Sequence, residues 1–111
     1  MKQIRHESGF NPNARGSSGE VGIAQIMPQT AKGWGVDPTD PVASLNAAAQ
    51  HMGTYSNDLG GDYAKALSAY NYGEWRTKNA IARCGLQYWQ QCIPASTRSY
   101  IKVICGSSTC I

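Results

Sequence analysis

The chain has 111 residues, which lies in the size range of one compact domain and excludes a second full domain beside it. Hydrophobic residues make up 41% and charged residues 15%, so the chain can bury a core, and a collagen-like chain or a charge-driven disordered tail is excluded. The net charge of +3 comes without a basic block, which argues against a nucleic-acid partner.

Helical signals dominate the first 35 residues, and glycine and proline divide them. Residues 1–8 are predicted to form the last turns of a helix that Gly9 ends, and residues 11–20 are predicted to form a polar loop. An apolar run at residues 21–27 leads to Pro28, which suits the first turn of a short helix that stops near residues 33–35.

The clearest amphipathic pattern follows a turn at residues 37–41. Asp40 is the predicted N-cap and Pro41 the first helical residue, and the helix is expected to end before residues 60–61. Its apolar face recurs at three- and four-residue steps and contains Val42, Leu45, Ala48, Ala49, Met52 and Tyr55.

Three more helices are predicted in the second half. Asp62 caps one that Gly73 stops, a second runs over residues 74–83 with Gly85 as its C-cap, and Pro94 opens the last. The residues expected to face the core are Tyr63, Ala66, Leu67, Tyr70, Ala80, Ile81, Tyr100, Ile101, Val103 and Ile104. No segment alternates long enough for a large sheet, so we expect a mainly α fold with at most a short strand or two.

An even number of cysteines, four, lies between residues 84 and 110 with no C-x-x-C pair. This pattern favours disulfides over reduced thiols, and it fits a structural zinc site less well because the spacings do not match common ligand pairs. Pairing Cys84 with Cys92 and Cys105 with Cys110 closes short local loops and is the favoured one of three possibilities. Disulfides would place the protein outside the reducing cytosol.

The N-terminal residues contain no apolar run that could serve as the core of a signal peptide. No other stretch is long and apolar enough for a membrane span. We therefore expect neither a signal peptide nor a spanning segment in this chain.

One carboxylate stands out because most enzyme templates lack parts here: there is no Ser-His-Asp spacing and no glycine-rich phosphate loop. Glu7 ends the first predicted helix, directly before a turn. A carboxyl among apolar neighbours loses hydration, its pKa rises, and it can donate a proton to a leaving oxygen near neutral pH. Taken alone, such a residue is more often a solvated surface charge.

Three ordered motifs favour a functional role for Glu7 over a solvated surface charge. They are ESGFNPNA at residues 7–14, GIAQIMPQTA at residues 22–31 and AYNYG at residues 69–73. They resemble the motifs of lytic transglycosylases with a goose-lysozyme-like catalytic domain, and TRSYIKV at residues 97–103 is a fainter fourth match. The resemblance implies a mainly α, lysozyme-like single domain over residues 1–111, and the positions of the cysteines mark residues 84–110 as a cysteine-rich C-terminal segment. It also implies an enzyme that cleaves the β-1,4 bond between N-acetylmuramic acid and N-acetylglucosamine in peptidoglycan.

Carried over by position, the resemblance makes Glu7 the catalytic acid and base, and makes Gln25, Tyr70 and Asn71 substrate-binding residues. The muramoyl 6-hydroxyl of the substrate is then the nucleophile and leaves a 1,6-anhydro sugar, so one carboxylate suffices and neither a metal nor an organic cofactor is expected. Aromatic faces can stack on sugar rings, and the candidates for this are Trp34, Tyr72, Trp75 and Tyr88.

Three departures from the family pattern stand in the sequence. Ala24 replaces the usual methionine, Ser96 replaces a glutamate found in many members, and only six residues precede Glu7. The short start predicts either a segment excised from a longer chain or a minimal enzyme delivered by a phage particle or an envelope-spanning secretion assembly.

The resemblance also implies where the protein works: on peptidoglycan glycan strands, in the periplasm or cell wall or in a phage virion, as a monomer. Two alternative functions stay open on the residues. One is a hydrolytic muramidase (lysozyme) of phage or secretion-system origin. The other is an inactive cell-wall-binding module.

Overall fold

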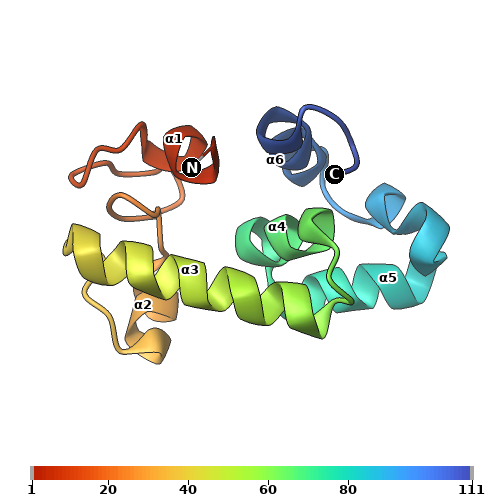
Figure 1. Ribbon diagram of the computed structural model, residues 1–111, viewed down its shortest axis with the longest axis horizontal. Coiled ribbons are helices and arrows are strands. Elements are labelled where there is room, and N and C mark those ends of the chain that lie inside the picture. The colour runs from red at the N-terminus through yellow and green to blue at the C-terminus, as the bar shows by residue number, and fades with distance from the viewer. Residues whose placement is uncertain (1, 111) are drawn as a thin grey trace. The chain divides into compact units, whose positions relative to one another are not determined.

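The computed structural model describes residues 2–110, and helices dominate them (Figure 1). The elements in chain order are α1 Lys2–Ser8, α2 Pro28–Trp34, α3 Pro41–Asp58, α4 Tyr63–Tyr72, α5 Glu74–Tyr88, the 3-10 helix η1 Trp89–Cys92 and α6 Ala95–Cys105. Within these residues, extended pairing is limited to isolated bridges from Val21 to Arg15 and to Ile26. The predicted mainly α class is confirmed.

Two compact units divide the chain: unit 1 ends at His51 and unit 2 begins at Met52, so α3 contributes to both. In unit 1 the helices are short and turns join them. Gly9 ends α1 and Gly35 caps α2, each in the left-handed region at φ 63° and 69°, as their glycine identity predicted. The buried residues of this unit are Gln3, Ile4, Val21, Ile23, Ala24, Ile26, Ala31, Ser44 and Ala48.

Helix α3 begins as predicted, because the Asp40 carboxylate accepts a hydrogen bond from the Ala43 amide at 3.1 Å. The predicted apolar face is wrong at Val42, which is 67% exposed, and at Ala49, which is also exposed. The buried residues Ser44, Ala48 and Met52 recur at four-residue steps, so the buried stripe is narrower than predicted. Val42 precedes Ser44 by two residues, about 200° around the helix, which places it on the opposite side.

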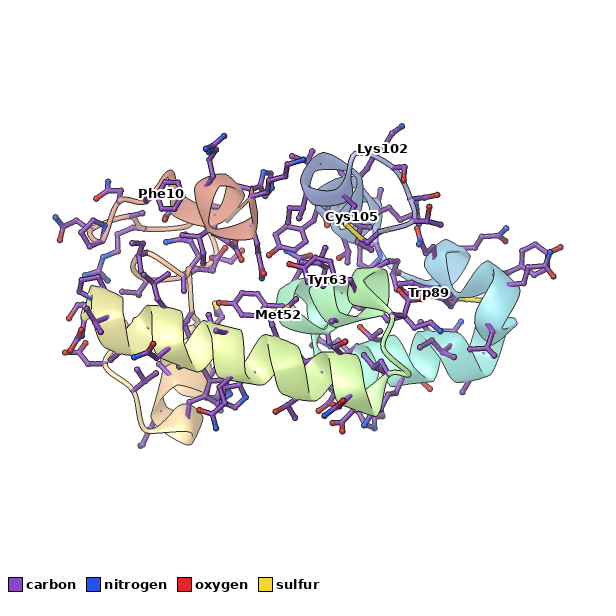
Figure 2. The ribbon with its side chains drawn as sticks, viewed as in Figure 1. Phe10, Met52, Tyr63, Trp89, Lys102 and Cys105 are labelled. Atoms are coloured by element: carbon purple, nitrogen blue, oxygen red, sulfur yellow. A yellow bond between two sulfur atoms is a disulfide. The ribbon has the colours of Figure 1, made fainter. Side chains whose placement is uncertain are left out.

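In unit 2, helix α4 packs against both α5 and α6. The Asp62 side chain caps α4 by accepting from the Lys65 amide at 3.3 Å, as predicted. A buried hydrogen bond of 2.8 Å joins Ser68 of α4 to Thr77 of α5. Met52 and Trp89, labelled in Figure 2, belong to the core of this unit, whose members are Met52, Ala64, Ala66, Leu67, Ala80, Trp89, Ile93, Tyr100, Ile101 and Ile104.

Val103 was predicted to face this core, but it is 57% exposed. The buried residues of α6 are Thr97, Tyr100, Ile101 and Ile104, and Val103 lies two residues from Ile101, on the far side of the helix. Tyr63 was also predicted inward and is exposed at the start of α4.

The segment after Gly85 is more helical than predicted. Gly85 breaks the helix at φ 81° and ψ 166°, as its predicted C-cap role required, but residues 86–88 and η1 then continue helically where a loop was expected. Both favoured disulfides are present: Cys84–Cys92 spans 6.3 Å between Cα atoms and Cys105–Cys110 spans 5.0 Å. Across residues 2–110, no helix has the length and apolar character that crossing a membrane requires.

Candidate active site

Glu7 lies in the last turn of α1 and is partly buried. Its neighbour Ser8 ties the end of this helix to the second motif, because the Ser8 hydroxyl donates to the Ile23 carbonyl at 2.6 Å. The chain then turns sharply through Gly9 and Phe10, which both have left-handed backbones, and the Phe10 side chain is exposed (Figure 2). The carboxylate therefore sits on an anchored helix end beside a constrained turn.

The turn at residues 22–25 depends on a glycine. Gly22 has φ 85°, a conformation that residues with a side chain rarely adopt, and a Cβ atom there would collide with the Pro38 carbonyl oxygen. The Gly22 amide donates to the Ala14 carbonyl at 2.9 Å, which joins this turn to the end of the first motif. Close backbone packing therefore explains why this motif begins with glycine.

Gln25 adopts a left-handed backbone at φ 49°, which is rare for residues other than glycine and is typical of functional sites. Its side-chain Nε2 donates to the Gly22 carbonyl at 2.8 Å and to the Ala14 carbonyl at 3.1 Å. Both amide hydrogens are thus engaged with backbone, so Oε1 is the atom of this side chain suited to accept from a ligand. Ala24, one of the family departures, is fully buried.

Tyr70 and Asn71 lie in the last turn of α4, before Gly73 at φ 116°. The Asn71 Oδ1 atom accepts a hydrogen bond from the Thr97 hydroxyl at 2.9 Å, and Thr97 is 1% exposed in the first turn of α6. Asn71 itself is exposed, so its amide NH₂ group remains as the donor for a ligand. Tyr70 is half-buried and packs against the core of unit 2.

Sequence reasoning assigned no role to Thr97 or Ser8, although both lie within quoted motifs. Thr97 is the first residue of the fourth motif, and Ser8 directly follows the candidate acid. A small hydroxyl residue next to a candidate polar group was the available signal. Ser96, where many family members have glutamate, is exposed in the first turn of α6.

The four aromatic candidates differ in accessibility. Trp34 stacks on the His51 ring, with centroids 3.8 Å apart, and the Arg76 guanidinium lies 5.6 Å from the centre of the Tyr72 ring. Trp75 and Tyr88 are the exposed members of this set. These two are therefore the ones most able to present a ring to a sugar.

Unit 2 contains a local ion pair at the start of α5. Glu74 pairs with Lys78 at 3.4 Å, and burial together with the Glu74 charge raises the pKa of Tyr55 above its ordinary value. Within residues 2–110 no group of three or more His, Cys, Asp or Glu side chains is placed to hold a metal ion. Of the candidate residues, Glu7 and Gln25 belong to unit 1, and Tyr70 and Asn71 belong to unit 2.

Comparison with known proteins gives consistent matches. A family model described as the transglycosylase SLT domain matches residues 1–89. Membrane-bound lytic murein transglycosylase D of Escherichia coli (strain K12) is 34% identical over 107 residues, covering 86% of this chain and 24% of that protein. Peptidoglycan transglycosylase gp16 of Escherichia phage T7 is 37% identical over 81 residues, covering 66% of this chain and 6% of that protein.

The crystal structure of the 70 kDa soluble lytic transglycosylase SLT70 from Escherichia coli has a similar fold. The TM-score is 0.82 at 25% sequence identity, over 97% of this chain and 20% of that chain. The chain therefore spans about a quarter or less of the length of each of these proteins.

Proposed function

Because the chain belongs to the transglycosylase SLT domain family, we propose that it cleaves peptidoglycan at the β-1,4 bond between N-acetylmuramic acid and N-acetylglucosamine. The family match and the fold similarity to SLT70 confirm the predicted family and the lysozyme-like fold class. The glycosidic bond that is cleaved, the products that are released and the residues that catalyse the reaction are our proposal.

Glu7 is the general acid and base of this reaction. Its carboxyl protonates the glycosidic oxygen while the bond from that oxygen to the muramoyl anomeric carbon breaks. The carboxylate then takes the proton of the muramoyl 6-hydroxyl, whose oxygen bonds to the anomeric carbon. The product is a 1,6-anhydromuramoyl end, and Glu7 returns to its protonated form.

A second protein carboxylate is not needed in this scheme. Most glycosidases that transfer to water use two carboxylates, one as acid and one as base or nucleophile, whereas here the substrate supplies the nucleophile. The four motifs agree with this, because Glu7 is the one Asp or Glu that they contain. The mechanism therefore calls for no metal and no organic cofactor.

Gln25, Tyr70 and Asn71 bind the glycan. The Gln25 Oε1 atom accepts from a sugar hydroxyl or an acetamido N–H, since both hydrogens of its Nε2 are held by the backbone. Asn71 donates through its NH₂ group, because its oxygen is held by Thr97. Tyr70 contributes its ring edge and hydroxyl.

The observation that carries the proposal is the hydrogen bond from Ser8 to the Ile23 carbonyl. It joins the helix end that bears Glu7 to the turn that bears Gln25, and these two segments belong to the first and second family motifs. A positioned acid requires such an anchor, because loss of proton-transfer geometry costs rate steeply.

The direct test is the Glu7→Gln variant in a cell-wall clearing assay. We expect a rate at least about 100-fold lower with an unchanged melting temperature, which is the scale for removing a general acid. Glu20→Gln is the matched control in the same unit, because the Glu20 carboxylate accepts from the Ser18 amide in an exposed loop. If Glu7→Gln cleared walls as fast as the parent, the assignment of the acid would be wrong.

We also propose that the protein works outside the cytoplasm or within a phage particle, as a monomer whose two units form one domain. The two disulfides and the relative in phage T7 support this setting. Its expected partner is the glycan strand of peptidoglycan. A single sedimenting species of about 12.0 kDa with one unfolding transition is the expected result.

A further inference from the structure

A cavity of about 660 Å³ lies entirely within unit 2, at the end of α4 remote from Tyr70 and Asn71. Three segments line it: residues 61–64 at the start of α4, residues 86–91 at the end of α5 and in η1, and residues 108–110 of the C-terminal loop. Its volume falls within the roughly 300 to 1,000 Å³ of small-molecule sites. Gln25, Tyr70 and Asn71 do not line it, whereas Tyr88, one of the exposed candidates for stacking on a sugar ring, does.

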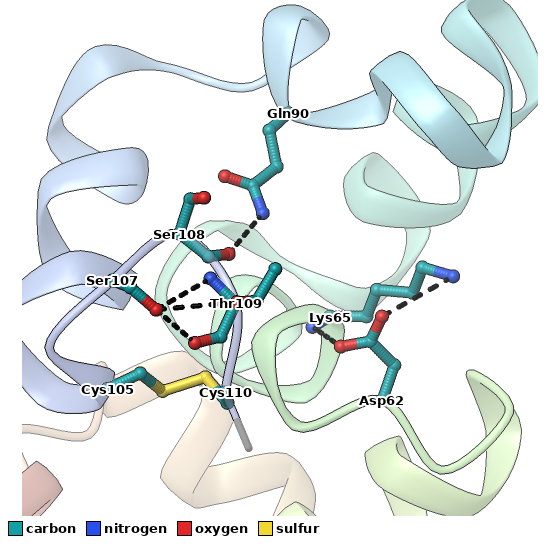
Figure 3. Close-up of a disulfide and its surroundings, with 8 residues drawn as sticks. All are labelled: Asp62, Lys65, Gln90, Cys105, Ser107, Ser108, Thr109 and Cys110. Carbon is teal, nitrogen blue, oxygen red and sulfur yellow. Dashed lines mark hydrogen bonds and ion pairs between the residues drawn. A yellow bond between two sulfur atoms is a disulfide. The ribbon is translucent and has the colours of Figure 1, made fainter.

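Covalent and polar links fix the walls of this cavity. One disulfide, Cys84–Cys92, brackets the segment of residues 86–91, and the other, Cys105–Cys110, closes the C-terminal loop. Figure 3 shows the link between these two walls: the Gln90 Nε2 atom donates to the Ser108 carbonyl at 2.8 Å. The cavity is therefore built before any ligand arrives, which lowers the entropy lost on binding.

The lining combines exposed aromatic rings with uncharged polar groups. The rings belong to Tyr63, 42% exposed, and Tyr88, 53% exposed. The polar groups are the amides of Gln87, Gln90 and Gln91 and the hydroxyls of Ser108 and Thr109. Rings that stack on C–H faces, together with amides and hydroxyls that bond to hydroxyl groups, are the means by which proteins hold sugars.

The charged side chains of the lining indicate the charge of the ligand that the cavity can hold. The described lining residues include no Lys or Arg, and their one charged side chain, Asp62, pairs with Lys65 at 3.7 Å (Figure 3). A peptide or headgroup rich in carboxylate or phosphate would find no Lys or Arg in this lining, and the lysine beside it, Lys65, is already paired with Asp62. An uncharged ligand meets no such penalty.

We propose that this cavity is a second saccharide-binding site, which takes an uncharged N-acetylhexosamine unit between Tyr63 and Tyr88. The glutamine amides match the acetamido group, which offers one N–H and one carbonyl oxygen. This site does not depend on the catalytic role of Glu7. On an insoluble glycan, a second attachment point raises the effective concentration of the protein at the polymer.

The test is a site-resolved NMR titration of the Glu7→Gln chain with the N-acetylglucosamine tetramer, a neutral probe. We expect saturable amide shifts at residues 61–64, 86–91 and 108–110 within about 10 mM probe, which corresponds to a dissociation constant on the order of 1 mM. Tyr88→Ala should weaken this binding at least about fivefold, whereas Tyr88→Phe, which keeps the ring, should retain it. Val103→Ala, an exposed apolar change outside the cavity, is the matched control and should leave it unchanged.

Four outcomes would overturn the proposal. Shifts confined to the surroundings of Glu7, Gln25 and Asn71 would reject the second site while supporting the proposed function. Shifts at the cavity with an acidic stem peptide but not with the tetramer would assign the cavity to peptide. Absence of any cavity shift, or equal affinity in Tyr88→Ala, would also reject it.

Discussion

The two units achieve order by different means. Both non-glycine residues with a left-handed backbone among residues 2–110, Phe10 and Gln25, lie in unit 1, within the first and second motifs. In unit 2 the left-handed positions are all glycines, at helix ends and turns. Unit 1 therefore holds its candidate residues through constrained turns and polar contacts, and each such turn costs free energy that the rest of the unit must offset.

Unit 2 relies on packed helices instead. Helix α4 contacts α5 and α6 around an apolar core, and both disulfides of the described chain lie in this unit. A single backbone change should therefore harm unit 1 most, whereas loss of covalent links should harm unit 2 most.

Gly22→Ala should have the largest effect. The new Cβ would collide with the Pro38 carbonyl in a left-handed backbone, so we expect a loss of about 3 kcal/mol or more in the free energy of unfolding, measured by urea denaturation. Gly53→Ala is the matched control, because its Cβ in α3 would meet no atom within 4 Å. It should stabilise the helix by about 0.5 to 1 kcal/mol. Equal effects of the two variants would contradict the account of unit 1.

Reduction of both disulfides should act on unit 2. We expect a loss of about 2 to 4 kcal/mol, because the unfolded chain gains freedom when the loops open. Hydrogen exchange, read residue by residue, should quicken in α5, η1 and α6 more than in α1 and α2. An unchanged melting temperature with and without reductant would contradict this prediction.

Thr97→Val should have a smaller effect centred on Asn71. The substitution keeps the shape of the buried side chain but removes the hydroxyl that holds Asn71 Oδ1 at 2.9 Å, so about 1 kcal/mol of stability should be lost. If Asn71 binds substrate, KM should also rise, and Thr97→Ser, which keeps the hydroxyl, should restore it. A KM that stays at the parent value in Thr97→Val would remove the positioning role from Thr97.

Much of the fold could be predicted because its signals are local. Asp40 and Asp62 cap helices, Gly9 and Gly35 end them, and Cys84 pairs with Cys92 over a short separation. Each of these features depends on residues close in sequence. The predicted inward faces failed at Val42 and Val103, because the width of a buried stripe is set by neighbouring helices and not by the apolar period alone.

The sequence located the candidate site residues but not the contacts that hold them. The motifs located Glu7, Gln25, Tyr70 and Asn71 as candidates, and their roles stay predictions. The contacts from Ser8 to Ile23 and from Thr97 to Asn71 join residues 15 and 26 positions apart. No local pattern encodes such pairs. The left-handed backbone of Gln25 was also not foreseeable, since glutamine carries no preference for it.

Mass spectrometry of the soluble products released from purified peptidoglycan tests the central claim most directly. A 1,6-anhydromuramoyl end is lighter than a reducing end by one water, so the two products separate by mass. Our account predicts anhydro ends with the parent chain and none above background with Glu7→Gln. Reducing ends alone would contradict it and identify a hydrolytic muramidase, and release of no product would leave a cell-wall-binding module.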